Sequence, residues 1–137
     1  MCWKLIDSYE YSEKEIRCLN PLSIAYIGDC IYELYIRNYM VKKYGTINSY
    51  KIHFEVVKYV NAKAQKEAYF KIREFLLDEE TIYFKKGRNT KVKTIPKNAL
   101  LSDYKIATGF ETVIGYLYIT KKFERLDFMM NQILNCI

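Results

Sequence analysis

The sequence has few of the residues that divide a chain into short strands. Its 137 residues include five glycines and two prolines, too few for the many tight turns of a β-sandwich or β-barrel. Apolar runs are also short, and none approaches the roughly 18 to 20 residues that a membrane-spanning helix requires. These absences predict a helical, soluble protein with no membrane partner. Half of the residues are apolar, so a chain of this length can bury a core without disulfides or structural metal.

Cysteine is scarce and ungrouped. The four cysteines form no C-x-x-C pair and show no zinc-type spacing, and no secretory leader precedes them; they are Cys2, Cys18, Cys30 and Cys136. We therefore expect reduced thiols in a cytoplasm. Cys18 and Cys30 are expected to be small residues of the core.

Capping signals predict about seven helices in one compact all-α domain. Ser12 and Glu15 form a capping box, and Asn20 before Pro21 starts a second helix that should run to about Tyr44. A third helix is expected from 48 or 49. The others are expected over 61–75, 78–86, 102 or 103 to 120, and 122–135.

Positive charge is concentrated in one segment. Six basic residues and no acid lie between positions 81 and 102, whereas the other parts of the chain balance 16 basic against 16 acidic residues. Charge runs are usually solvated loops, but turn-forming and hydrogen-bonding residues lie among these cations, which favours a shaped clamp for phosphates. The candidate clamp residues are Lys85, Lys86, Arg88, Asn89, Lys91, Lys97 and Asn98.

Isolated acids lie in two helices that are otherwise apolar on nearly every side. The second helix carries Asp29 and Glu33 within 22–36, and the sixth has Glu111 as its one acid or base within 107–120. Glu33 has a simpler interpretation as an exposed partner of Arg37, four residues later. A single buried acid is more often structural than functional. Two helices of this unusual kind, each with an isolated acid, favour a functional pair instead.

Glycines within the same two helices indicate that the helices cross closely. Gly28, Gly109 and Gly115 lie there although each costs about 1 kcal/mol relative to alanine. A close crossing would bring Asp29 toward Glu111, and two carboxylates in an apolar wall cannot both stay ionised without a cation. Mg²⁺ fits, because it accepts few carboxylates and keeps several waters.

Histidine is nearly absent, which narrows the possible phosphate chemistry. His53 is the only one, whereas cleavage through a ribose 2′-OH by a histidine pair needs two such groups. Water activated by a metal is the mechanism that remains.

Ordered sequence blocks resemble the ribonuclease III superfamily in its short form, Mini-ribonuclease III. Residues 20–33 read NPLSIAYIGDCIYE and look like the signature helix of that superfamily. Later blocks are similar in order and spacing; they are VNAKAQ at 60–65, KGRN at 86–89, PKN at 96–98 and FETVIGYLY at 110–118. The resemblance covers about 19–126.

The resemblance implies a Mg²⁺-dependent endoribonuclease that cuts double-stranded RNA as an all-helical homodimer. Asp29 and Glu111 match its catalytic, metal-binding acids. Full-length relatives carry two further acids, which match Ala25 and Thr108 here; the short form lacks them. Thr108 and Glu33 are expected beside the metal ligands. The resemblance also implies maturation of precursor large-subunit (23S) ribosomal RNA, with help from a ribosomal protein in some cases.

One catalytic domain over 1–137, without an appended double-stranded RNA-binding domain, is the expected organisation. Two other classes of function fit the composition. A non-catalytic RNA-binding or ribosome-assembly protein could share the fold and the basic segment, with Asp29 and Glu111 as structural acids. A helical interaction module could instead use the basic surface to bind acidic protein or membrane headgroups.

Overall fold

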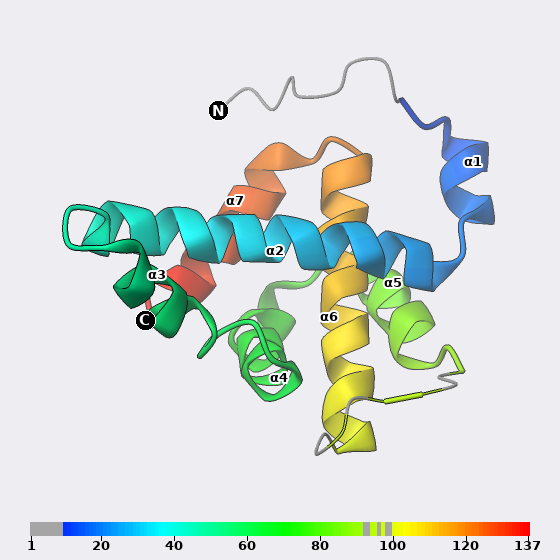
Figure 1. Ribbon diagram of the computed structural model, residues 1–137. Coiled ribbons are helices and arrows are strands. Elements are labelled where there is room, and N and C mark those ends of the chain that lie inside the picture. The colour runs from blue at the N-terminus through cyan, green and yellow to red at the C-terminus, as the bar shows by residue number, and fades with distance from the viewer. Residues whose placement is uncertain (1–9, 92–93, 96, 98–99) are drawn as a thin grey trace.

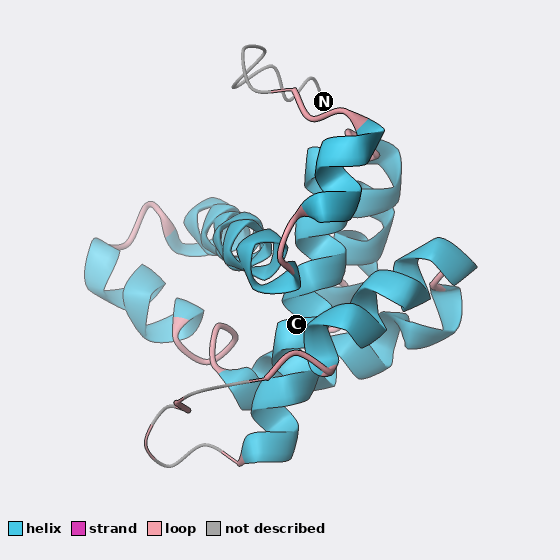
Figure 2. Cartoon of the chain, turned by 90° about the vertical axis from the view of Figure 1, so that its right-hand side faces the viewer, coloured by secondary structure: helices cyan, strands magenta, loops and turns pink. Residues whose placement is uncertain are grey.

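Seven α-helices follow one another in the computed structural model (Figure 1), which describes residues 10–91, 94–95, 97 and 100–137. The helices are α1 Glu13–Cys18, α2 Pro21–Tyr44, α3 Ser49–Val56, α4 Ala62–Ile72, α5 Asp78–Arg88, α6 Leu101–Ile119 and α7 Phe123–Leu134, with a 3₁₀ turn at Arg73–Phe75. The described residues contain helices and loops and no strand (Figure 2). This confirms the all-α prediction.

The predicted caps form at the first four helices. Ser12 and Glu15 form the capping box of α1, and the Asn20 side chain accepts a hydrogen bond from Leu22 N at the start of α2. Asn48 and Asn61 cap α3 and α4 in the same way. Each cap satisfies a backbone N–H that the first helical turn leaves without a partner.

Three predicted helix boundaries were wrong. The fourth helix was expected to reach residue 75, but α4 ends at Ile72 and a 3₁₀ turn follows. The sixth helix begins at Leu101, one or two residues before the expected polar cap. The fifth continues through Gly87 to Arg88 instead of ending before the glycine. Gly87 is there for packing: a Cβ atom at this position would lie 2.1 Å from Thr112 Oγ1, so α5 can approach α6 only without a side chain.

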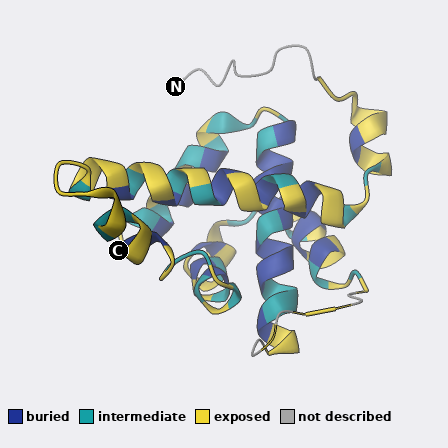
Figure 3. Ribbon diagram, viewed as in Figure 1, coloured by how far each residue is buried: buried dark blue, intermediate teal, exposed yellow. Residues whose placement is uncertain are grey.

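Helix α6 is the central element of the core. It is buried along most of its length (Figure 3), and α2, α4, α5 and α7 all pack against it. Figure 1 shows the long α2 crossing α6 steeply on one side. Phe110 of α6 meets Tyr32 of α2 edge to face, with ring centroids 5.2 Å apart. α6 is buried on nearly every side, as its sequence predicts. The same prediction was wrong for α2, which is buried where it faces α6 and is exposed along its outer side.

The α2–α6 crossing is made at two glycines. A Cβ atom on Gly28 would lie 1.7 Å from the Glu111 carbonyl oxygen, and one on Gly115 would lie 2.0 Å from the Ile24 carbonyl oxygen. Gly109 has a different neighbour from the one expected, because it faces Phe84 of α5. Backbone-to-backbone contact at Gly28 and Gly115 therefore sets the position of Asp29 relative to Glu111.

One expectation about burial was wrong. Cys18 and Cys30 are exposed free thiols, so their placement in the core was wrong; each lies on the outer side of its helix. No helix in the described residues is long and apolar enough to span a membrane.

Candidate active site

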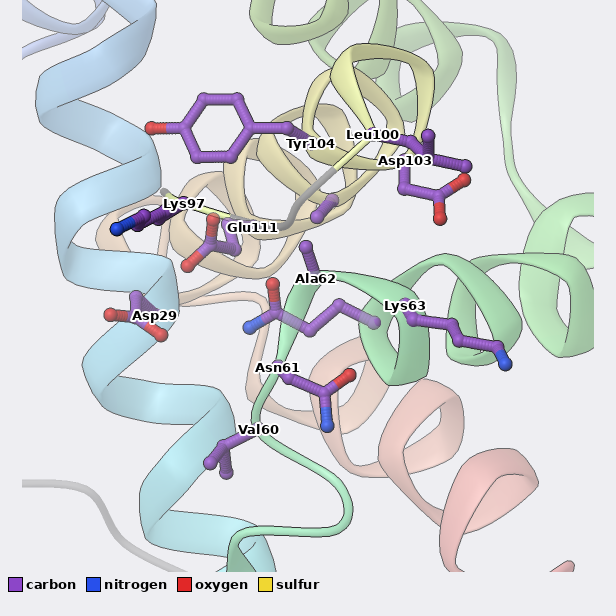
Figure 4. A pocket seen from close by; sticks show the side chains of 12 residues that line it. Asp29, Val60, Asn61, Ala62, Lys63, Lys97, Leu100, Asp103, Tyr104 and Glu111 are labelled. Carbon is purple, nitrogen blue, oxygen red and sulfur yellow. The ribbon is translucent and has the colours of Figure 1, made fainter. Parts of the chain in front are cut away.

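A cavity of about 750 Å³ lies beside the α2–α6 crossing (Figure 4). Its walls come from α2, from the turn between α3 and α4, from the first turn of α4, from the first half of α6, and from the connection that precedes α6. The lining residues are Asp29, Val60, Asn61, Ala62, Lys63, Gln65, Lys97, Leu100, Asp103, Tyr104, Ala107 and Glu111. Segments far apart in the sequence thus form one site.

Asp29 and Glu111 turn their carboxyl groups toward the same space, together with the ammonium group of Lys97 (Figure 4). Asp29 is exposed and Glu111 is only partly exposed. Burial raises the pKa of Glu111 to about 9, and a hydrogen bond and charge repulsion from Asp29 act in the same direction. Two carboxyl groups held this close repel each other when both are ionised, and a bound cation would stabilise the doubly ionised pair.

Gln65 is a third polar group at this point. It lies in the first turn of α4, and its side chain is 4% exposed. The amide hydrogen-bonds the Glu111 carboxyl group and favours its ionised form, against the effect of burial. Asn61 fixes the start of α4, since its side chain accepts from Ala64 N at 2.9 Å and donates to Val57 O at 3.2 Å. The cap therefore orients the helix that presents Gln65.

The donor set fits a hard divalent cation such as Mg²⁺. Asp29 and Glu111 supply carboxylate oxygens, and no thiol or imidazole lines the cavity. No group of three or more His, Cys, Asp or Glu side chains converges within the described ranges. Mg²⁺ needs only one or two carboxylates, because it keeps waters and takes ligands from a phosphate. The pair is thus sufficient to hold this ion.

Two residues predicted beside the metal ligands are not part of this group. Glu33 pairs with Arg37 on the surface of α2 at 3.3 Å, the simpler of its two interpretations. Thr108 donates its hydroxyl to the Tyr104 carbonyl oxygen at 2.9 Å and is buried within α6. Neither lines the cavity.

The basic segment is only partly a loop. Its first three cations lie in the last turn of α5, where positive charge interacts favourably with the helix dipole. Lys97, by contrast, lines the cavity. Asn98 lies outside the described residues. The other positions are Lys85, Lys86 and Arg88 in the helix, Asn89 at its C-cap, and Lys91 after it.

Sequence reasoning missed several cavity residues. Asp103 at the start of α6 lines the cavity and pairs with Lys66 of α4, with Nζ 2.7 Å from Oδ1. Tyr104 and Gln65 also line the cavity. The sequence of α4 offered one signal for Gln65. It lies four residues after the Asn61 cap, and three alanines lie within three residues of it. That pattern identifies a polar residue on a packed face but not what it faces.

Comparison with known proteins identifies the family. The family described as "Ribonuclease III domain" matches residues 22–122. Mini-ribonuclease 3 of Clostridium tetani is 44% identical over 126 residues, which cover 92% of this chain and 83% of that protein. Mini-ribonuclease 3 of Enterococcus faecalis is 42% identical over 120 residues, covering 86% and 90%. The chain belongs to the Mini-ribonuclease 3 family.

A crystal structure of a protein from Fusobacterium nucleatum has the same fold. Its TM-score is 0.79 at 35% identity, over 88% of this chain and 95% of that one. Membership in the Mini-ribonuclease 3 family confirms the resemblance and the fold, and it makes the protein an endoribonuclease of the ribonuclease III class, whose substrate is double-stranded RNA. The roles assigned to individual residues remain predictions.

The carboxyl pair predicts an unusual pH dependence for this Mini-ribonuclease 3 family member. Because the pKa of Glu111 rises from 4.5 to about 9 on folding, the unfolded chain releases this proton first as pH increases. Without divalent metal, the free energy of unfolding should therefore fall between about pH 4.5 and 9, by up to about 1.4 kcal/mol per pH unit. Glu111→Gln should remove this contribution.

Urea denaturation in EDTA at pH 6, 7 and 8 measures the effect. Glu33→Gln, which changes a surface acid on α2, is the matched control and should keep the wild-type slope. Parallel pH profiles for wild type and Glu111→Gln would show that Glu111 titrates normally.

Proposed function

We propose that the protein is a Mg²⁺-dependent endoribonuclease that hydrolyses phosphodiester bonds in duplex RNA, with Asp29 and Glu111 as its metal ligands and catalytic acids. The observation that carries this proposal is the convergence of the two carboxyl groups in one cavity beside Lys97. A family of endoribonucleases favours this function over a non-catalytic RNA-binding or ribosome-assembly protein.

The residues around the pair have distinct tasks in this proposal. When bound, Mg²⁺ lowers the pKa of a bound water and neutralises charge on the phosphate. Asp29 and Glu111 would hold the ion, and the Gln65 amide, which hydrogen-bonds the Glu111 carboxyl group, would keep that group oriented. Lys97 contacts a phosphate oxygen at the same cavity. Cleavage leaves 5′-phosphate and 3′-hydroxyl ends.

The basic segment supplies grip on the RNA backbone. Duplex RNA hides its base edges in a deep, narrow major groove, so recognition depends on phosphates, 2′-OH groups and A-form shape. Lys85, Lys86, Arg88 and Lys91 lie on or just after the end of α5 and are well placed to meet phosphates, since all but Arg88 are exposed. Asn89 and Asn98 add hydrogen bonds. We expect little sequence preference.

A homodimer is part of the proposal. The outer side of α2 carries exposed apolar residues at successive spacings of four, eight and seven residues, namely Leu22, Tyr26, Leu34 and Val41. Large exposed apolar side chains in one row are typical of an interface. A twofold axis at this face would set two Asp29 sites against the two strands of one duplex and give a staggered cut.

The biological substrate that we propose is precursor large-subunit (23S) ribosomal RNA, processed in the cytoplasm with help from a ribosomal protein. The free thiols of Cys18, Cys30 and Cys136 support a reducing compartment. Ribosomal RNA as the substrate is what the sequence resemblance implies.

One incubation tests the proposed function. Purified protein is mixed with a perfect RNA duplex, with and without Mg²⁺, and the product ends are mapped on both strands. We expect Mg²⁺-dependent cuts on both strands, offset from each other, with 5′-phosphate ends. A duplex from the base of a precursor large-subunit RNA, compared with an unrelated duplex of equal length, tests the substrate. Retention of the duplex without any cut in Mg²⁺ would favour the non-catalytic alternative.

A further inference from the structure

A second cationic region lies outside the basic segment. Residues 34–66 contain seven basic residues and one acid, Glu55. Their charge disappears from a balance over the whole chain because acids are in excess in 1–33 and 67–80. Opposite charges cancel in the local electrostatic potential only where they lie close together in space. The folded surface therefore decides whether this excess of positive charge can attract a polyanion.

The fold gathers much of this charge on α3 and the end of α2, which lie side by side (Figure 1). We call this surface the α3 face and define it by Lys42, Lys43, Tyr50, Lys51, Phe54 and Lys58. Tyr50 is 77% exposed and Phe54 is 49% exposed. The only acid of the region, Glu55, is already neutralised by Lys51 at 2.9 Å and Lys58 at 3.1 Å.

The cations of the α3 face are held by aromatic rings. Lys58 Nζ lies 4.8 Å and Lys51 Nζ 5.7 Å from the centre of the Phe54 ring. Lys43 Nζ lies 5.4 Å from that of Tyr44. Contacts of this kind restrict long side chains that would otherwise be mobile. Less conformational entropy is then lost when the ammonium groups meet phosphates.

The α3 face continues into the wall of the active-site cavity. The turn that follows α3 supplies Val60 and Asn61 to that wall, and Lys63 of α4 stands beside them. The Tyr32 hydroxyl donates to the Tyr59 carbonyl oxygen at 2.8 Å, which ties the turn to α2. Lys97 and Leu100 belong to the connection on the other side of the cavity. A polyanion seated over the cavity therefore meets cations on two sides.

We propose that the α3 face binds the phosphate backbone of the duplex beyond the bond that is cut, so that the RNA is held on both sides of the cavity. The proposal rests on the proposed function. The α3 face favours a duplex as its occupant for two reasons. It extends the active-site cavity, which binds a duplex under the proposed function. It also presents ammonium groups for phosphates rather than a pocket for a base. The bases stacked inside a duplex cannot stack on Tyr50 or Phe54. Phe54 instead holds the ammonium groups of Lys51 and Lys58.

Salt dependence of binding tests the proposal. All proteins carry Asp29→Asn to separate binding from cleavage. Lys43→Gln with Lys58→Gln leaves the Lys51–Glu55 pair intact. The matched control, Lys14→Gln with Lys71→Gln, removes the same charge at two exposed lysines on α1 and at the far end of α4. Affinity for a 30-base-pair duplex is measured between 50 and 200 mM salt.

Each lost phosphate contact lowers the slope of log K against log salt by roughly 0.9. We expect the α3-face double variant to lose about two units of slope and the control to lose none. Equal slopes in both variants, whether unchanged or equally reduced, would overturn the proposal.

A second binding experiment asks whether the α3 face binds single-stranded RNA rather than a duplex. Tyr50→Ala should leave duplex affinity within twofold of the parent. A loss of tenfold or more for a single strand, with a smaller loss for the duplex, would assign the face to stacked single-stranded bases instead and overturn the proposal. Cleavage is assayed separately without Asp29→Asn: if the parent binds duplex with the expected slopes but the wild type never cuts, the proposed function fails while the α3 face stands.

Discussion

Asp29→Asn and Glu111→Gln are each expected to lower the rate of duplex RNA cleavage in Mg²⁺ by about 10³-fold or more. A bound metal contributes several kcal/mol of charge stabilisation in the transition state, and each 1.4 kcal/mol corresponds to a factor of ten. Both substitutions keep the shape of the side chain. Removing negative charge should also leave duplex affinity equal or higher, so the loss should appear in kcat.

Single-turnover cleavage at saturating protein measures this loss. Glu67→Gln, an exposed acid on α4 that is not in the cavity, is the matched control and should cut at the wild-type rate. If either cavity variant cuts within a few-fold of wild type, that residue does not hold an essential metal.

Gly28→Ala and Gly115→Ala are expected to destabilise the protein strongly, with a free-energy loss of about 3 kcal/mol or more and a melting temperature about 10 °C lower. Helix propensity alone predicts the opposite sign, because alanine is favoured over glycine by about 1 kcal/mol. The new Cβ atoms would lie 1.7 Å from the Glu111 carbonyl oxygen and 2.0 Å from that of Ile24. Backbone atoms of a buried helix cannot move away cheaply.

Thermal and urea unfolding measure the effect. Ser23→Ala, an exposed position on α2, is the control and should be neutral or slightly stabilising. Cleavage should fall in the glycine variants even where they remain folded, because separating α2 from α6 separates the two acids. A Gly115→Ala protein as stable as wild type would mean that the helices are not in backbone contact there.

Local signals in the sequence predicted most of the helices, because their causes are local. An asparagine or serine cap acts on N–H groups two or three residues away, and the structure has the caps at Ser12, Asn20, Asn48 and Asn61. The error at Gly87 has the opposite cause. Gly87 stands inside a helix because Thr112 of α6 leaves no room for a side chain there, and nothing near Gly87 in the sequence carries that information.

Surface charge and residue burial show the same contrast between local and tertiary causes. The sequence indicated the basic segment because its charges are consecutive. It did not indicate the α3 face, whose lysines are spaced along two helices and are cancelled in the total by distant acids. Cys18 and Cys30 were wrongly placed in the core, because residue type gives only a tendency to be buried.

The sequence by itself determined an all-helical chain, two apolar helices with isolated acids, and a family of endoribonucleases, since these follow from short-range capping, composition and ordered blocks. Only the tertiary structure decided that Asp29 and Glu111 share a cavity, that Gln65 hydrogen-bonds the second of them, and that Glu33 and Thr108 lie elsewhere. Those relations depend on how closely two helices approach and at what angle, which is fixed by backbone contact at Gly28 and Gly115.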